Sequence, residues 1–267
     1  LEESLRADPE LSRIFGLDGR PGDHGEVVWS VSTASEGIRA SLSRTHGGFD
    51  NDPPTMLGVE KLPPPQGQRL IPAEAHGIKM ISMGLLVKPG QPLIWRGPML
   101  NSAIRQFLGD VEWGELDYLI VDLPPGTGDI QISLCTQVPV TGAVIVCTPQ
   151  DVAISDARKG ISLFQLPQTN IPVLGLVENM SWFTPAELPE NRYYIFGKDG
   201  VKNLAEELKL PLLAQLPLVQ SVREAADAGR PAVLQENTPQ AAAFIKMAGS
   251  IAQQAAIVNA GALVEQQ

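Results

Sequence analysis

The feature that most constrains the fold is residues 117–129, where an apolar run leads directly into a sharp turn. Residues 118–121 are all apolar and include types that favour β-strands. Unbroken apolar runs are typical of strands buried on both faces of a parallel sheet, so we expect a covered, internal strand here. Asp122 closes the run, two prolines and two glycines form the turn, and a predicted helix begins near residue 130.

Similar apolar runs alternate with helix-like segments along the rest of the chain. The predicted strands are residues 26–31, 78–83, 143–147, 173–177 and 212–216, and residues 53–72 form a proline-rich loop. The predicted helices are residues 34–43, 98–108, 151–164, 201–208, 222–228 and 241–257. This alternation predicts an α/β fold with a doubly wound, mostly parallel sheet and helices on both faces.

For the predicted helix over residues 151–164, the sequence predicts both the cap residue and the residues that face the core. Asp151 stands where a helix cap is expected, directly before the apolar pattern begins. The spacing predicts that Val152, Ala157, Ile161 and Phe164 face the core.

The length of 267 residues, 43% of them hydrophobic, suffices for one large α/β domain or two small ones. We predict a single domain over residues 25–267, preceded by an irregular segment over residues 1–24. The net charge of -10 argues against nucleic acid as a partner, because phosphate binding needs a basic surface. No apolar run approaches the length of a membrane span and no signal-peptide pattern is visible, so we expect no membrane contact.

The chain has two cysteines, Cys135 and Cys147. So few cysteines exclude a disulfide-rich scaffold and are consistent with the reducing cytoplasm, where we expect the protein to work. We expect both side chains to be small buried apolar groups.

Asp122 is the first candidate for chemistry, because ligands bind at the carboxyl ends of parallel strands. Followed by Gly126 and Gly128, it resembles the Walker B aspartate and switch loop of a P-loop NTPase. The carboxylate would hold a Mg²⁺-bound water, and the glycines would let backbone amides approach a phosphate. The alternative is an ordinary strand-to-helix turn capped by Asp129.

Several further motifs together resemble the Mrp-type iron–sulfur cluster carrier ATPases, which belong to the MinD/ParA group of P-loop NTPases. The matching runs follow the order of the family at residues 54–59, 94–99, 117–129, 148–153, 156–160, 177–180 and 194–197. By this resemblance Asp50 and Asp52 correspond to an aspartate pair that positions the attacking water or the metal. Asp122 corresponds to the metal-holding carboxylate, and Gly126 and Gly128 to the switch loop.

The same resemblance assigns a base-binding site and a function. Asn179 corresponds to the asparagine that hydrogen-bonds adenine, and Pro217 and Leu218 supply backbone to the adenine pocket. The family implies ATP and Mg²⁺ as cofactors, a homodimer, and ATP-dependent transfer of iron–sulfur clusters to target apoproteins.

Two departures from the family pattern keep other functions open. Residues 27–37 stand where the family has its phosphate loop, yet they contain no lysine and no glycine before Gly37. Residues 182–191 contain no Cys-x-x-Cys, although thiolates are the expected cluster ligands. The alternatives are therefore a non-hydrolysing scaffold of the same fold, or a ParA-like positioning ATPase. The acidic charge weighs against the positioning ATPase.

A local reading-frame error is a further hypothesis for the missing phosphate loop. The codons for residues 26–32, read from the last base of the glutamate codon, can encode Gly-Gly-Val-Val-Gly-Lys, close to the missing motif. Resequencing the codons for residues 20–55 tests this hypothesis, and an intact frame contradicts it.

Overall fold

A computed structural model describes residues 26–32, 53–86, 97–123, 132, 135–136, 138–235 and 237–265. Its main sheet has five strands in the order β4-β1-β5-β6-β7, and every neighbouring pair is parallel. The strands are β1 (Glu26–Ser32), β4 (Tyr118–Leu123), β5 (Gly142–Cys147), β6 (Val173–Glu178) and β7 (Leu212–Gln215). The predicted parallel α/β sheet is therefore confirmed. The expected helix over residues 34–43 lies outside the described residues.

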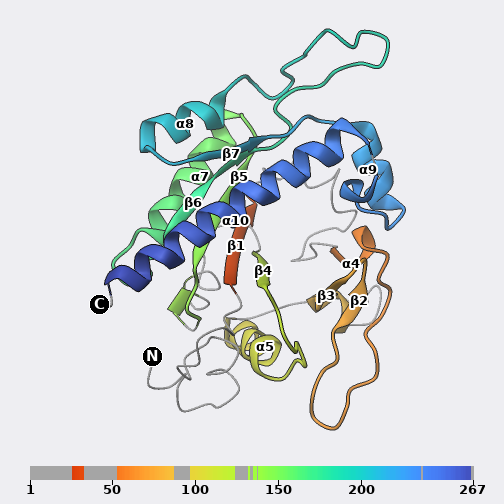
Figure 1. The fold of residues 1–267 in the computed structure, drawn as a ribbon, viewed down its shortest axis with the longest axis vertical. Helices are drawn as coiled ribbons and strands as arrows, with labels where there is room; N and C mark the ends of the chain where they lie inside the picture. Colours follow the sequence, from red (N-terminus) through yellow and green to blue (C-terminus); the bar gives the residue numbers. More distant parts are fainter. Residues whose placement is uncertain are drawn as a thin grey trace.

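Helices cover both faces of this sheet, as Figure 1 shows. On one face lie α7 (Asp151–Phe164) and α8 (Gly200–Leu208), which pack mainly on β5 and β6. On the other face α10 (Pro239–Glu265) runs across β7, β6 and β5. The remaining helices are α4 (Pro53–Met56), α5 (Gly97–Gly109), α9 (Gln220–Asp227), and the short η1 (Met83–Leu86) and η2 (Ala232–Leu234).

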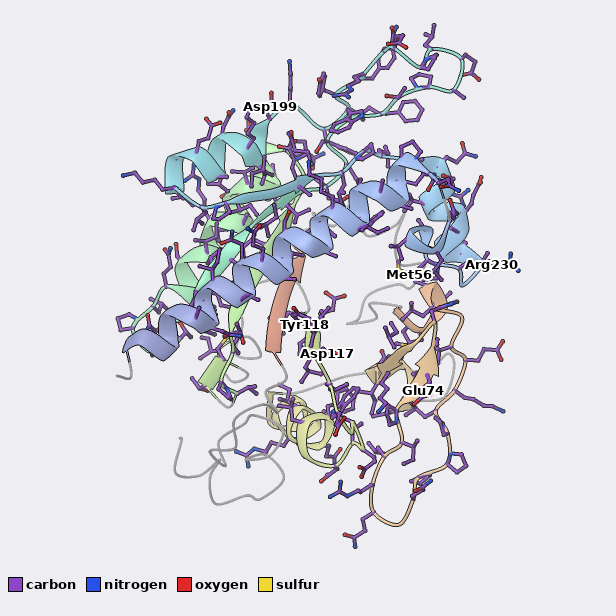
Figure 2. The ribbon with its side chains drawn as sticks, viewed as in Figure 1. Met56, Glu74, Asp117, Tyr118, Asp199 and Arg230 are labelled. Atoms are coloured by element: carbon purple, nitrogen blue, oxygen red, sulfur yellow. The ribbon has the colours of Figure 1, made fainter. Side chains whose placement is uncertain are left out.

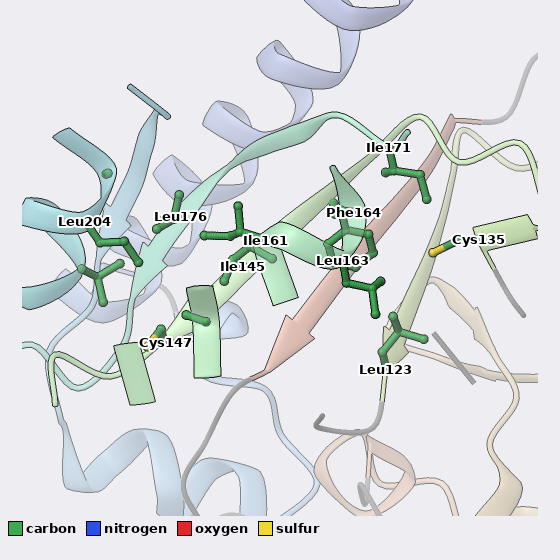
Figure 3. Packing of buried hydrophobic residues seen from close by; sticks show 14 of the residues in the cluster. Leu123, Cys135, Ile145, Cys147, Ile161, Leu163, Phe164, Ile171, Leu176 and Leu204 are labelled. Atoms are coloured by element: carbon green, nitrogen blue, oxygen red, sulfur yellow. The ribbon is translucent and has the colours of Figure 1, made fainter. Parts of the chain in front are cut away.

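Two apolar clusters form the core, one under each helical layer. The larger joins the sheet to α7 and α8 around fully buried Phe164, Ile161 and Ile145 (Figure 3). The smaller joins Val144, Val177 and their neighbours to α10. Because both faces of β5 and β6 are covered, these two strands are apolar along nearly their whole length.

The predicted buried face of α7 is correct in three positions and wrong in one. Ala157, Ile161 and Phe164 are buried, but Val152 is 68% exposed and Ala153 is buried in its place. The predicted cap is also wrong, because Gln150 is the N-cap residue and Asp151 lies in the first turn. A helix turns about 100° per residue, so Val152 lies on the side opposite Ile161, whereas Ala153 lies on the same side as Ala157 and Ile161.

The prediction that the strand after Asp117 is covered on both faces is wrong. Tyr118 is 43% exposed and Ile120 is 68% exposed, whereas Leu123 at the strand end is buried. The reason is the position of β4 at the end of the described sheet, with β1 as its one neighbour there. Side chains on an edge strand are covered only where a helix or loop crosses them. Figure 2 shows Asp117 and Tyr118 at the start of this strand.

The region from residue 53 to residue 86 is more ordered than a proline-rich loop and a single strand. It begins with α4, and β2 (Ala73–Ala75) pairs with β3 (Ile78–Met80) in a short antiparallel hairpin. At Gly58, with φ 69°, the backbone passes so close to Gly229 that a Cβ on Gly229 would lie 2.6 Å from the Cα of Gly58. This contact ties α4 to α9, where Figure 2 shows Met56 beside Arg230.

The expectation that no segment approaches membrane-span length needs correction at α10. By length and composition alone, residues Pro239–Gly261 are apolar enough to cross a membrane, with a mean hydropathy of 1.3. Phe244, Met247 and Ile251 nevertheless pack against the sheet, so part of this apolarity belongs to the core. Ile245 and Ile257 point away from the core and are 60% and 56% exposed.

Candidate nucleotide-binding site

The candidate site lies at the carboxyl edge of the sheet, where all five parallel strands end. Asp122 stands near the end of β4, in register with Ser30 of β1. Asn179 directly follows β6, which is separated from β4 by β1 and β5. Three inter-strand spacings of about 4.8 Å place the two strands roughly 14 Å apart. That separation suits an extended nucleotide whose base and terminal phosphate are bound at different strands.

Asn179 belongs to a tight turn that is held by backbone hydrogen bonds. Its N–H donates to the Cys147 carbonyl at the end of β5 at 2.8 Å. Its side-chain oxygen accepts the N–H of Met180 at 3.0 Å, and Met180 has a positive φ of 55°. The Asn179 side chain is half-buried. The turn therefore fixes the backbone of the residue predicted to read adenine.

The second predicted wall of the base pocket is bonded to the same turn. The Ser181 N–H donates to the Leu216 carbonyl at 2.9 Å, and the Leu218 N–H donates to the Trp182 carbonyl at 2.7 Å. Pro217 and Leu218 are half-buried. The structure thus brings together Asn179, Pro217 and Leu218, which are almost forty residues apart in the chain.

Of the residues predicted at the phosphate end of the site, Asp122 is the one that lies among the described residues. Asp122 is exposed at the carboxyl edge of β4, as a carboxylate that holds a hydrated cation must be. Mg²⁺ in nucleotide sites usually takes one or two carboxylates together with phosphates and waters, so a single aspartate fits this role. Asp50, Asp52, Gly126 and Gly128 lie outside the described residues. No cluster of three His, Cys, Asp or Glu side chains suited to a metal occurs in the part of the chain that is described.

Both cysteines are buried, as predicted, and neither is a ready surface ligand for a cluster. Burial raises the pKa of the Cys135 thiol to about 11, which favours the protonated form over the thiolate. The Cys147 thiol lies 3.1 Å from the Thr148 carbonyl, to which it donates inside the core.

Sequence reasoning missed three buried polar residues at this edge, Thr148, Glu178 and Ser181. Glu178, the last residue of β6, is 0% exposed, and Thr148, which follows β5, is 3% exposed. The Thr148 hydroxyl has no hydrogen-bond partner among the described residues. The available signal was a polar residue directly after an all-apolar strand, which marks the ligand edge of a parallel sheet.

This arrangement defines the class of protein. A parallel α/β sheet with a carboxylate at the end of β4 and an asparagine turn after β6 is the frame of a P-loop-type nucleotide-binding protein. A ParA family model described as NUBPL iron-transfer P-loop NTPase matches residues 49–252. The chain belongs to this family.

Curated relatives agree with this assignment. The chain is 47% identical to the iron–sulfur cluster carrier protein of Synechocystis over 96% of its own length and 73% of that protein. It is 50% identical to the iron–sulfur cluster carrier protein of Deinococcus radiodurans over 75% of its own length and 56% of that protein. It therefore spans from about half to three quarters of the length of these two relatives.

A solved structure extends the similarity to the fold. The nucleotide-binding protein of Archaeoglobus fulgidus, in complex with ADP, superposes with a TM-score of 0.59 at 28% identity. The match covers 90% of this chain and 85% of that protein. The family match begins at residue 49, after the segment in which the phosphate loop was expected and not found.

Proposed function

We propose that this chain is an ATP-dependent carrier that binds an iron–sulfur cluster and passes it to target apoproteins. The observation that carries the proposal is the turn that begins at Asn179, which is bonded through Ser181 and Trp182 to Leu216 and Leu218 at the carboxyl edge of a family sheet. The similarity to cluster carriers over nearly the whole chain supports the choice of cargo.

In this proposal the two ends of the site have separate tasks. Asn179 and the backbone of Pro217 and Leu218 bind and orient adenine. Asp122 holds the hydration shell of Mg²⁺, which when bound neutralises charge on the phosphate oxygens. An aspartate of the Asp50 and Asp52 pair orients the water that attacks the terminal phosphate. ATP hydrolysis then changes the hold of the protein on its cluster or client.

The cluster is cargo in this scheme, and a Cys-x-x-Cys of this chain does not hold it. The loop between β6 and α8, which projects from the sheet in Figure 1, has no cysteine. We further propose that the carrier works in the cytoplasm as a homodimer. The exposed aromatic side chains of this loop, Tyr193 and Tyr194, support an interface there.

Calorimetry of Mg-ATP binding to the purified chain tests the nucleotide half of the proposal. We expect micromolar binding (on the order of -8 kcal/mol) that weakens in Asn179→Ala, because the adenine contact is lost. Anaerobic loading with iron and sulfide, followed by transfer to an apo-ferredoxin, tests the cargo half. Absence of both binding and transfer contradicts the carrier function.

A second candidate is a non-hydrolysing scaffold that dimerises and holds assembly partners. The specific observation in its favour is the segment 27–37, which has none of the lysines that neutralise phosphate charge in the family. The scaffold predicts no heat change with Mg-ATP together with intact binding to a partner. The carrier function predicts that Mg-ATP binding gives a measurable heat change.

A further inference from the structure

Glu178 is the one charged side chain that is fully buried among the described residues, with 0% exposure. A carboxylate without partners is very costly to bury, so its partners show what it is there to hold. One carboxylate oxygen accepts the N–H of Val201 at 2.9 Å and that of Lys202 at 3.4 Å. The other accepts the side-chain amide of Gln215 at 2.8 Å.

These donors come from two different elements, α8 and β7. Val201 and Lys202 lie in the first turn of α8, where amide groups lack partners within the helix and favour a negative charge. Gln215 is the last residue of β7, and its amide also donates to Asp199 at 3.2 Å. Figure 2 shows Asp199 at the start of α8. The Glu178 side chain therefore ties the start of α8 to the end of β7.

The main chain of the same residue is bonded to the turn after β6 and to the segment after β7. The Glu178 carbonyl accepts the N–H of Leu216 at 2.8 Å and the hydroxyl of Ser181 at 2.9 Å. Asn179 is the next residue, and Leu218 lies two residues beyond Leu216. A shift of Glu178 would consequently move the adenine-reading side chain relative to the opposite backbone wall.

We propose that Glu178 is a positioning residue for base recognition, which sets the preference for adenine over guanine by fixing the spacing between Asn179 and Leu218. This inference rests on the proposed nucleotide-binding function. It does not make Glu178 a ligand of the nucleotide, because its two oxygens are already taken by α8 and β7. A carboxylate suits the position because every group that faces it in these bonds is a donor.

The variant Glu178→Gln keeps the shape of the side chain and replaces one acceptor with a donor. That donor must face either the backbone amides of α8 or the amide of Gln215, so one of these bonds is lost. We expect the ratio of ATP to GTP affinity, measured by calorimetry, to fall about tenfold. The matched control is Leu204→Ala, which destabilises α8 through the core without touching this network. Its affinity ratio should equal that of the wild type.

A measurement without ligand keeps the test independent of nucleotide binding. Native-state hydrogen exchange of the Ser181 and Leu218 amides should be about tenfold faster in Glu178→Gln, and unchanged in Leu204→Ala after correction for global stability. Unchanged exchange and an unchanged affinity ratio in Glu178→Gln overturn the positioning role. An equal fall in the ratio of ATP to GTP affinity in both variants also overturns the positioning role, because a general loss of stability then accounts for the effect.

The binding and exchange measurements distinguish a failure of the role of Glu178 from a failure of the nucleotide-binding function on which it rests. Wild-type protein that binds ATP, with a ratio unaffected by Glu178→Gln, leaves the function standing and removes the role of Glu178. Wild-type protein that binds neither nucleotide removes the function and with it base selection. The exchange rates then decide whether Glu178 holds the two turns together.

Discussion

Replacing Asp122 with alanine is expected to lower ATP turnover by roughly 100-fold or more. The physical reason is that, in the proposed function, this carboxylate holds the Mg²⁺ shell, and a metal clamp on phosphate oxygens contributes several kcal/mol to transition-state stabilisation. About 2.7 kcal/mol corresponds to a hundredfold change in rate. Release of inorganic phosphate under saturating Mg-ATP measures the effect. Because Asp122 is exposed, the substitution should leave the protein folded.

The matched control for this prediction is Asp117→Ala on the approach to the same strand. Asp117 is also exposed and carries the same charge, but it precedes β4 and lies five residues from Asp122. At about 3.3 Å per residue, the two carboxylates are roughly 17 Å apart along the strand. Turnover in Asp117→Ala should match the wild type. Equal losses in both variants would indicate a general charge effect, and unchanged turnover in Asp122→Ala would remove Asp122 from the site.

Replacing Phe164 with alanine is expected to lower the free energy of unfolding by about 3–5 kcal/mol. The ring is 1% exposed at the end of α7, in the middle of the larger core cluster (Figure 3). Its removal loses apolar burial and leaves a cavity that rigid neighbours from β5 and α7 only partly fill. Because a domain of this kind is stable by about 5–15 kcal/mol, urea unfolding should show a large decrease in the midpoint.

The control is Val152→Ala on the same helix, where the side chain is 68% exposed. This change should alter the free energy of unfolding by no more than about 0.5 kcal/mol. A cost for Phe164→Ala as small as that of Val152→Ala would mean that the larger cluster is not the main core. A large cost for Val152→Ala would mean that this face of α7 is covered in solution.

The strands show most clearly which features of the fold could be predicted from the sequence and which could not. The unbroken apolar runs that became β5 and β6 predicted their burial, because a strand of this composition is stable only when both faces are covered. The run that became β4 looks the same in the sequence, yet Ile120 is 68% exposed. Whether an apolar strand is internal depends on which strands flank it, and its own residues carry no information on that point.

The residues of the candidate site also include one that the local sequence predicted and one that it did not. Asn179 was identified from its place after a strand in a family motif, and the structure confirms that it lies in a turn at the ligand edge. Glu178, one residue earlier, had only the general signal of a polar residue at the end of an apolar strand, and its donors Val201 and Gln215 lie 23 and 37 residues away. Nothing local in the sequence indicates that a charged side chain is buried or what satisfies it.

By itself, the sequence determined the parallel α/β fold, the family and the edge of the sheet at which the candidate site lies, because these follow from hydrophobic periodicity and from short motifs at strand ends. Tertiary structure alone decided that β4 ends the described sheet, that Val152 faces solvent, and that Glu178 joins α8 to β7. Each of these depends on contacts between segments far apart in the chain. Such contacts form only when the whole core packs, so local patterns cannot specify them.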